Sequence, residues 1–257
     1  DRVDAGAAGV WLLVGTDTDP ATLTGLLTAS TQAGEQAYLV PDGGADAGPA
    51  AQDVALTALR SVAEELGTAA LGRVRHRLVV THSVTAEDRA FLAAAGVSAT
   101  VVPDADGVLH APVASLLADA VSVCLGAGPA GDPWAAVRSA LSHPDPDERI
   151  SARSAFAAAT RTPLRALPDA PAAGLSVAPR LSVSAPAVFG VWDADAVAVQ
   201  SPDGRVAAWS TDTRAGTPLL PALDAETALP RWRATWVDGR IAAEDVARDA
   251  HDAATPA

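Results

Sequence analysis

The chain has 257 residues, of which 49% are hydrophobic, and its formal net charge is −13 at pH 7. This composition predicts a globular protein with a substantial core. The acidic balance argues against nucleic acid or an anionic membrane as a partner, because phosphate binding needs clustered positive charge. No apolar run approaches the roughly 20 residues of a membrane span. The chain begins at Asp1 and contains no methionine, so we expect that it is not a primary translation product as written.

A single cysteine, Cys124, excludes an internal disulfide framework. Its neighbours from residue 120 to residue 125 are mostly apolar, which favours a buried structural thiol over a nucleophile. A chain without disulfides fits a reducing compartment, and we therefore expect a cytoplasmic protein. All 18 basic residues are arginine, which is typical of a high-GC genome and carries no functional argument.

The first two-thirds of the chain alternates short apolar segments with amphipathic ones, the pattern of β/α units around a parallel sheet. The predicted strands are residues 37–40, 77–81, 99–102 and 121–125. The predicted helices are residues 21–32, 53–66, 85–94, 113–118, 133–140 and 152–160. Helix starts are marked by capping patterns, such as Thr85 with Asp88 three residues on, and Asp132 followed by Pro133.

The predicted secondary structure changes from β/α units to short β segments after about Pro163. Proline-rich connectors lead into short β-type segments with turn signals, among them residues 187–192, 196–200 and 234–237. We therefore expect two domains, residues 1–165 with α/β structure and residues 166–257 with a small β domain and a C-terminal tail.

Several segments, in unbroken order, resemble the metal-dependent amidohydrolase superfamily, in the branch related to N-acyl amino-acid deacylases. The resemblance rests on TQAGEQAYLVPDGGADAG from residue 31, RHRLVVTHSV from residue 75 and VSVCLGAGPAGDPWAAVRSAL from residue 121. It continues with ISARSAFAAATR from residue 150, RVAAWSTD from residue 205 and LPRWRATWVDGRI from residue 229. The resemblance implies an α/β fold that is the second half of a (β/α)8 TIM-type barrel, strands five to eight, followed by a small β-sandwich-like C-terminal domain.

The family hydrolyses carbon–nitrogen bonds such as amides, with zinc or another divalent metal held at the C-terminal mouth of the barrel. A histidine from the fifth strand matches Val40 here, and the aspartate that follows it matches Gly44. The Glu-His pair of the sixth strand matches Val79 and Val80, and the aspartate of the eighth strand matches Gly128. None of these side chains can ligate a metal. The resemblance therefore implies a degenerate site without a metal cofactor and a catalytically inactive protein.

Two residues remain as fallback candidates for a site. His82 follows the sixth strand and Asp42 follows the fifth, although a surface loop explains His82 better and a turn explains Asp42 better. The other histidines form no spaced metal motif; they are His76, His110, His143 and His251.

The missing first half of the barrel suggests a partner. Four parallel strands leave two open edges, so we expect another protein chain, or a missing N-terminal half, to complete the barrel. Residues 103–112 replace a much longer family loop that covers the mouth.

The leading hypothesis is an inactive barrel with an interaction, scaffold or regulatory role. One alternative is an active hydrolase whose ligands come from the missing half or from another chain. Another is a non-catalytic binder of a small amide or carboxylate, with Arg138 or Arg161 as its anchor.

Overall fold

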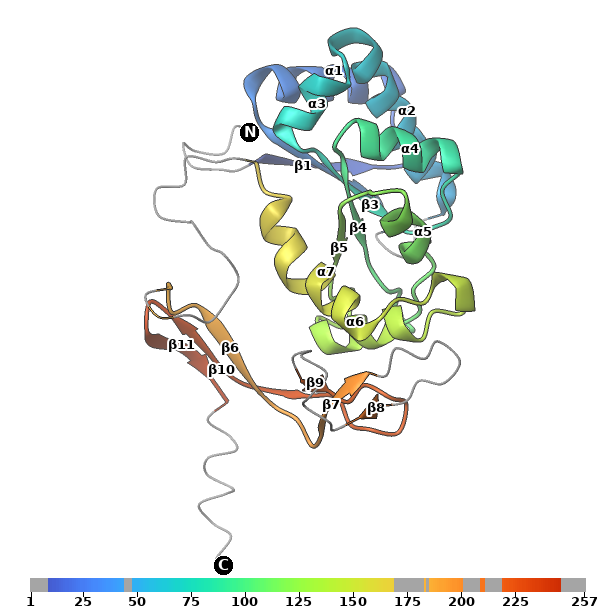
Figure 1. Cartoon of the computed structure of the whole chain (residues 1–257). Helices are drawn as coiled ribbons and strands as arrows, with labels where there is room; N and C mark the ends of the chain where they lie inside the picture. Colours follow the sequence, from blue (N-terminus) through green and yellow to red (C-terminus); the bar gives the residue numbers. More distant parts are fainter. Residues whose placement is uncertain are drawn as a thin grey trace, which may run out of the picture. The chain divides into compact units, whose positions relative to one another are not determined.

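The computed structural model describes residues 9–43, 48–168, 183, 185–200, 209–210 and 219–245. The chain divides into two compact units, residues 1–174 and residues 175–257. The first unit combines a parallel sheet with helices, and the second consists of antiparallel strands (Figure 1).

Five parallel strands form the sheet of the first unit, in the order β1-β2-β3-β4-β5. They are β1 (Gly9–Val14), β2 (Gln36–Pro41), β3 (Arg77–Val80), β4 (Ser98–Val101) and β5 (Val123–Leu125). The parallel pairing and the order of the four predicted strands are confirmed. The count of four is wrong, because β1 adds a fifth strand at the edge. Its sequence, GVWLLV, is a continuous apolar run of the kind found in parallel sheets.

Helices connect these strands, and the capping patterns in the sequence are confirmed at several of their starts. The helices are α1 (Pro20–Ala33), α2 (Pro49–Leu66), α3 (Thr68–Val74), α4 (Ala86–Ala94), α5 (Val113–Ala118), α6 (Pro133–Leu141) and α7 (Ala152–Arg165). Thr85 and Asp88 form a capping box, and the Asp132 carboxylate accepts from the first backbone N–H groups of α6. A 3-10 turn, Pro146–Glu148, lies between α6 and α7.

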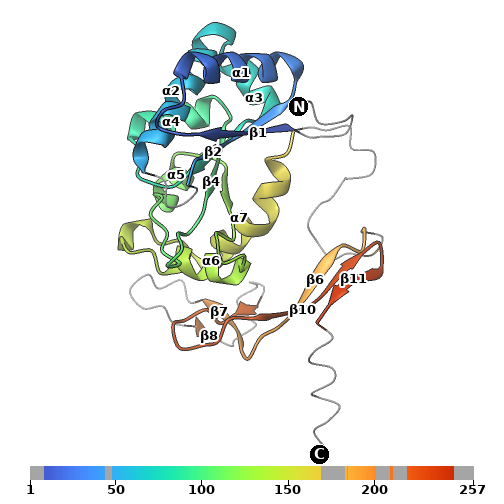
Figure 2. The same ribbon diagram turned by 180° about the vertical axis from the view of Figure 1, so that it is seen from behind.

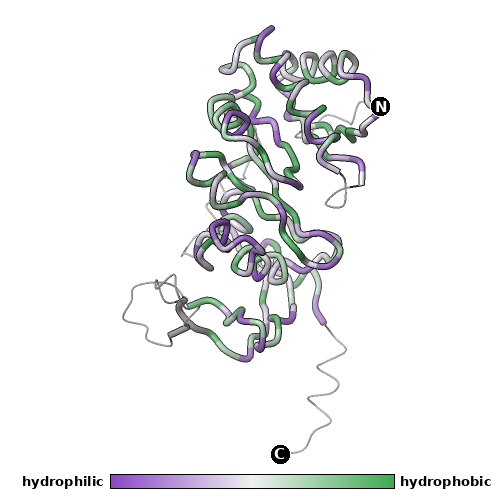
Figure 3. The backbone as a smooth tube through the Cα atoms, turned by 90° about the vertical axis from the view of Figure 1, so that its right-hand side faces the viewer, coloured by the Kyte–Doolittle hydropathy of each residue, from purple (hydrophilic) through white to green (hydrophobic). Residues whose placement is uncertain are grey.

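One face of the sheet is buried beneath helices. Register places Leu39, Leu78 and Ala99 on this face, and each is completely buried. The helices α1 and α2 contact β2, α4 contacts β4 and α5 contacts β5 (Figures 1 and 2). Figure 3 shows hydrophobic residues along the strands of this sheet. Burial of this apolar face supplies the main stabilisation of the unit.

At the edge formed by β5, α7 packs along the sheet. The end of this helix is tied to the starts of the central strands by hydrogen bonds. The Gln36 side chain donates to the carbonyl of Ala166 at 2.6 Å. The Arg75 guanidinium donates to the carbonyls of Arg165 and Leu167, at 2.9 and 3.0 Å. These bonds satisfy carbonyl groups at the helix end that have no partner within the helix.

The second unit contains two three-stranded antiparallel sheets. One has the order β11-β10-β6 and the other β8-β7-β9. Their strands are β6 (Phe189–Asp193), β7 (Val197–Gln200), β8 (Trp209–Ser210), β9 (Leu220–Pro221), β10 (Arg231–Val237) and β11 (Arg240–Glu244). The predicted β structure of this region is present, and its sandwich-like arrangement stays a prediction. Among the residues that the structure describes, none of the helices has the length and apolar character needed to cross a membrane.

His76 joins α1 to the start of the sheet. It is completely buried. Its Nδ1 accepts a hydrogen bond from the backbone N–H of Ala37 at 2.9 Å, and its Nε2 lies 2.8 Å from the Thr31 hydroxyl. The Thr31 hydroxyl in turn donates to the carbonyl of Leu27. The geometry requires a neutral imidazole that donates from Nε2. Burial lowers the pKa of His76 to about 4.

We expect acid to destabilise the protein through His76. The unfolded chain takes up this proton near pH 6.5, whereas the folded protein resists protonation until about pH 4. The stability that depends on neutral His76 is therefore complete above pH 6.5 and is lost as the pH falls from 6.5 toward 4. Urea unfolding should show a loss of about 2 kcal/mol between pH 7 and pH 5. His76→Gln should flatten this part of the profile, and an unchanged slope in the variant would contradict the assignment.

Candidate functional site

The carboxyl ends of parallel strands meet at one rim of the sheet, where barrel enzymes place their catalytic residues. Val40 lies near the end of β2, paired in register with Leu13, and is half-buried. Val79 is buried and pairs with Thr100 on the same face of the sheet as Val40. Val80 belongs to the opposite, helix-covered face and is completely buried. A ligand at position 80 would therefore point into the helical layer and not toward the rim. Gly44 lies outside the described residues.

Gly128 follows β5 and has a backbone conformation that suits glycine. Its φ is 66°, in the left-handed region. A Cβ atom at this position would lie 2.8 Å from the carbonyl oxygen of Pro103 and 2.9 Å from a carbon of the Pro103 ring. The loop after β5 thus approaches the loop after β4 more closely than any side chain at residue 128 allows. An aspartate at this position would require the backbone to move.

Of the two fallback candidates, His82 is held by a buried glutamine. The Gln52 side-chain oxygen accepts from the backbone N–H groups of Thr81 and His82, at 3.0 and 3.2 Å. The Gln52 amide donates to the carbonyl of Ser83. The Thr81 hydroxyl lies 2.9 Å from Nδ1 of His82. Gln52 therefore fixes the loop after β3, and this contact across the fold is not visible in the sequence.

Asp42 lies after β2 and is exposed. Its backbone N–H donates to the carbonyl of Val14 at 2.8 Å, which continues the pairing of β1 with β2. Within the described part of the chain no hydrogen bond or ion pair joins the Asp42 side chain to His82. The structure does not bring these two candidates into contact.

The structure instead brings His82 beside His110, which the sequence interpretation set aside. The two imidazole rings are stacked, with centroids 6.5 Å apart and planes 13° from parallel. Nε2 of His110 lies 2.8 Å from the Asp104 carboxylate. Burial alone would raise the pKa of Asp104, but hydrogen bonds from Val108, His110 and Asp106 outweigh it and lower this pKa. A signal was present, because Asp104 and His110 flank one short loop after a predicted strand.

These residues do not fit a zinc ion. The Asp104 carboxylate is occupied by two backbone N–H groups and by His110. A catalytic zinc needs about three protein donors directed at one point. In the described ranges, no group of three or more His, Cys, Asp or Glu residues could hold a metal ion.

The other candidates lie apart from the rim residues. Cys124 is buried in the middle of β5, as predicted. Burial raises the pKa of its thiol, and the nearby Arg77 guanidinium offsets only part of that effect. Arg138 lies on α6, and Arg161 is exposed on α7.

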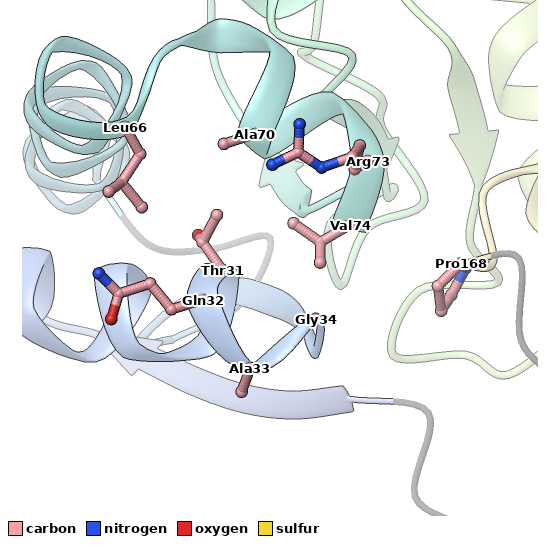
Figure 4. A pocket seen from close by; sticks show the side chains of 9 residues that line it. All are labelled: Thr31, Gln32, Ala33, Gly34, Leu66, Ala70, Arg73, Val74 and Pro168. Atoms are coloured by element: carbon pink, nitrogen blue, oxygen red, sulfur yellow. The ribbon is translucent and has the colours of Figure 1, made fainter.

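A hollow of about 520 Å³ lies between α1 and α3 (Figure 4). Arg73 is the one charged residue among those that line it; the others are Thr31, Gln32, Ala33, Gly34, Leu66, Ala70, Val74 and Pro168. Gly34 and Val74 precede the starts of β2 and β3, so this hollow lies at the end of the strands opposite the candidate rim. Neither Arg138 nor Arg161 lines it.

No protein-family model matches the sequence, and no curated protein matches it. Solved structures of hydrolases are similar in fold. One is a variant of triazine hydrolase, with 16% identity and a TM-score of 0.56, over 93% of this chain and 53% of that chain. Another is a mutant of the atrazine chlorohydrolase TrzN from Arthrobacter aurescens TC1, complexed with zinc and atraton. It has 16% identity and a TM-score of 0.54, over 94% of this chain and 53% of that chain.

The chain therefore spans about half the length of the solved structures that it resembles. At this identity the likeness concerns the fold. The five-stranded parallel sheet with its connecting helices is consistent with part of a TIM-like barrel.

The close approach at Gly128 can be tested with a matched glycine. Gly131 has nearly the same φ, 67°, but nothing lies within 4 Å of a Cβ built there. Gly131→Asp therefore carries only the cost of the left-handed backbone, whereas Gly128→Asp must also displace Pro103. We expect Gly128→Asp to be less stable than Gly131→Asp by about 2 kcal/mol in urea unfolding. Equal stabilities would show that the loop accepts an aspartate without strain.

Proposed function

We propose that this chain is part of an amidohydrolase-type barrel, descended from a metal-dependent hydrolase of carbon–nitrogen bonds, and that its own rim holds no catalytic metal. The fold likeness to triazine hydrolases, one of them solved with zinc, supports the descent. The family segments in the sequence support it further, because their predicted strands are neighbours in the expected order. Within this proposal, the branch is the one related to N-acyl amino-acid deacylases.

The observation that carries the proposed loss of metal is the geometry of Gly128. The family has an aspartate at the matching position, where it serves as ligand and general base. Here the backbone has adopted a conformation that favours glycine, and Pro103 fills the space that a side chain would need. Compared with the family, the difference thus involves not only one side chain but also the backbone paths of the loops after β4 and β5.

The valines at the other matched positions support the same proposal. Val80 is buried among helices, and Val40 offers only methyl groups to the rim. A bare dication loses at least tens of kcal/mol of hydration when it enters an apolar environment without ligands. Methyl groups return none of that energy. The retained β/α scaffold without a metal then suits an interaction, scaffold or regulatory role in the cytoplasm.

An alternative is a hydrolase whose ligands come from another polypeptide. The observation in its favour is that Val40 is half-buried and adjoins the edge strand β1 through Leu13. Residues from a partner at this edge could reach the rim. Under both proposals the isolated chain does not supply a complete metal site by itself.

Metal analysis and an activity screen test the proposal together. The protein should be purified with zinc present and its bound metal measured by inductively coupled plasma mass spectrometry. We expect far less than one zinc per chain, and no turnover of N-acyl amino acids or simple amides above the rate without protein.

One zinc per chain, with turnover that a chelator abolishes, would overturn the proposal. In that case the variants His82→Ala and His110→Ala would identify the ligands, because these two histidines lie side by side near the rim. The exposed Asp42 gives a matched variant, Asp42→Ala, on the neighbouring strand.

A further inference from the structure

Arginine gathers in one part of an otherwise acidic protein. The formal net charge of the chain is −13, yet residues 66–86 contain three arginines, residues 149–168 contain four, and neither segment contains an aspartate or a glutamate. The two segments meet in the fold, where the Arg75 guanidinium donates to the carbonyls of Arg165 and Leu167. A local excess of positive charge raises the electrostatic potential and favours the approach of anions.

The hollow between α1 and α3 opens in this part of the first unit. Its volume of about 520 Å³ lies within the range of pockets that hold small molecules. Arg73 of α3 and Pro168, which follows α7, both line it, so each arginine-rich segment contributes to its wall (Figure 4). On the side of α1 the hollow is open beside Gly34, where a Cβ atom would have nothing within 4 Å.

The charge at the hollow belongs to an arginine that no described residue neutralises. The Arg73 side chain is exposed, and it takes part in no hydrogen bond or ion pair with a described residue. Glu64 and Glu65 at the end of α2 form no ion pair with it, and Glu65 accepts from the Thr28 hydroxyl at 3.0 Å instead. A guanidinium offers five N–H donors in a planar fork whose geometry matches a carboxylate.

Apolar side chains line the wall next to this guanidinium. Ala70 and Val74 are buried, Leu66 is half-buried, and Figure 4 shows Ala70 and Val74 beside the Arg73 side chain. The Thr31 hydroxyl also lines the hollow but is already engaged by two hydrogen bonds within the chain. One cation next to apolar side chains suits a singly charged anion with an apolar body, whereas a phosphate dianion would need more donors.

We propose that this hollow binds a small free carboxylic acid with a short apolar body. The Arg73 guanidinium pairs with the carboxylate, and the apolar side chains of α2 and α3 cover the rest of the molecule. The hollow lies at the end of the strands opposite the candidate rim, so this proposal does not depend on the loss of the metal site, and the two can fail independently. It also names a different anchor from the two arginines that the sequence suggested for such a ligand, since neither of those lines the hollow.

Titration of the full chain with hexanoate, followed by NMR of the backbone amides in 15N-labelled protein, tests this site. We expect the amide signal of Gly34 to shift with a dissociation constant of about 1 mM, as for a small fragment with one charged contact. The amide signal of Gly131, in the loop after β5, should not move. Acetate lacks the apolar chain and should bind about tenfold more weakly or less. Hexylamine carries the opposite charge and should not bind.

A matched pair of arginine variants assigns the charge. Arg73→Gln should raise the dissociation constant of hexanoate about tenfold or more, because a charged hydrogen bond is lost. Arg161→Gln removes an exposed arginine of α7 that does not line the hollow, and it should change this constant by about twofold at most. Because Arg73 is exposed and unpaired among the described residues, Arg73→Gln should keep the melting temperature of the parent.

Three results would each overturn the proposal: equal binding of hexanoate and hexylamine, an unchanged constant in Arg73→Gln, or no shift of the Gly34 signal at about ten times the expected constant. A capped tripeptide with a central glutamate between two leucines separates a free acid from an acidic side chain of a polypeptide. If this tripeptide bound about tenfold more tightly than hexanoate, the proposed free acid would be wrong.

Discussion

The burial of one face of a parallel sheet under helices is the constraint on which the rest of the first unit depends. Parallel pairing fixes which residues share a face, and the residues paired with Leu39 and Leu78 must then be small or apolar. The same constraint determines which face of the sheet residue 80 occupies. Val80 lies on the helix-covered face, so its side chain packs in the core and does not point toward the rim.

The loops at the rim are organised by contacts within the chain itself. Gln52 holds the loop after β3, the pair of Asp104 and His110 closes the loop after β4, and the loop after β5 passes close to Pro103 at Gly128. In metalloenzymes a metal ion often provides part of this order. Here hydrogen bonds and close packing between the loops provide such order.

Much of the first unit could be predicted from the sequence, because its signals are local. Helix caps such as Asp132 depend on residues a few positions apart, and the order of four strands follows from alternating β/α segments. The edge strand β1 was missed, since a six-residue apolar run does not by itself distinguish a strand from other buried segments. The pairing of His82 with His110 and the conformation of Gly128 were also missed. Both depend on distances between separate loops, which no local pattern reports.

The central claim is that the rim at the carboxyl ends of β2, β3, β4 and β5 does not hold a divalent metal. Crystals soaked in zinc and measured above and below the zinc absorption edge test it most directly. The account predicts no anomalous peak at the rim. A peak about 2.1 Å from a nitrogen of His82 or His110, or from an oxygen of Asp42, would contradict it.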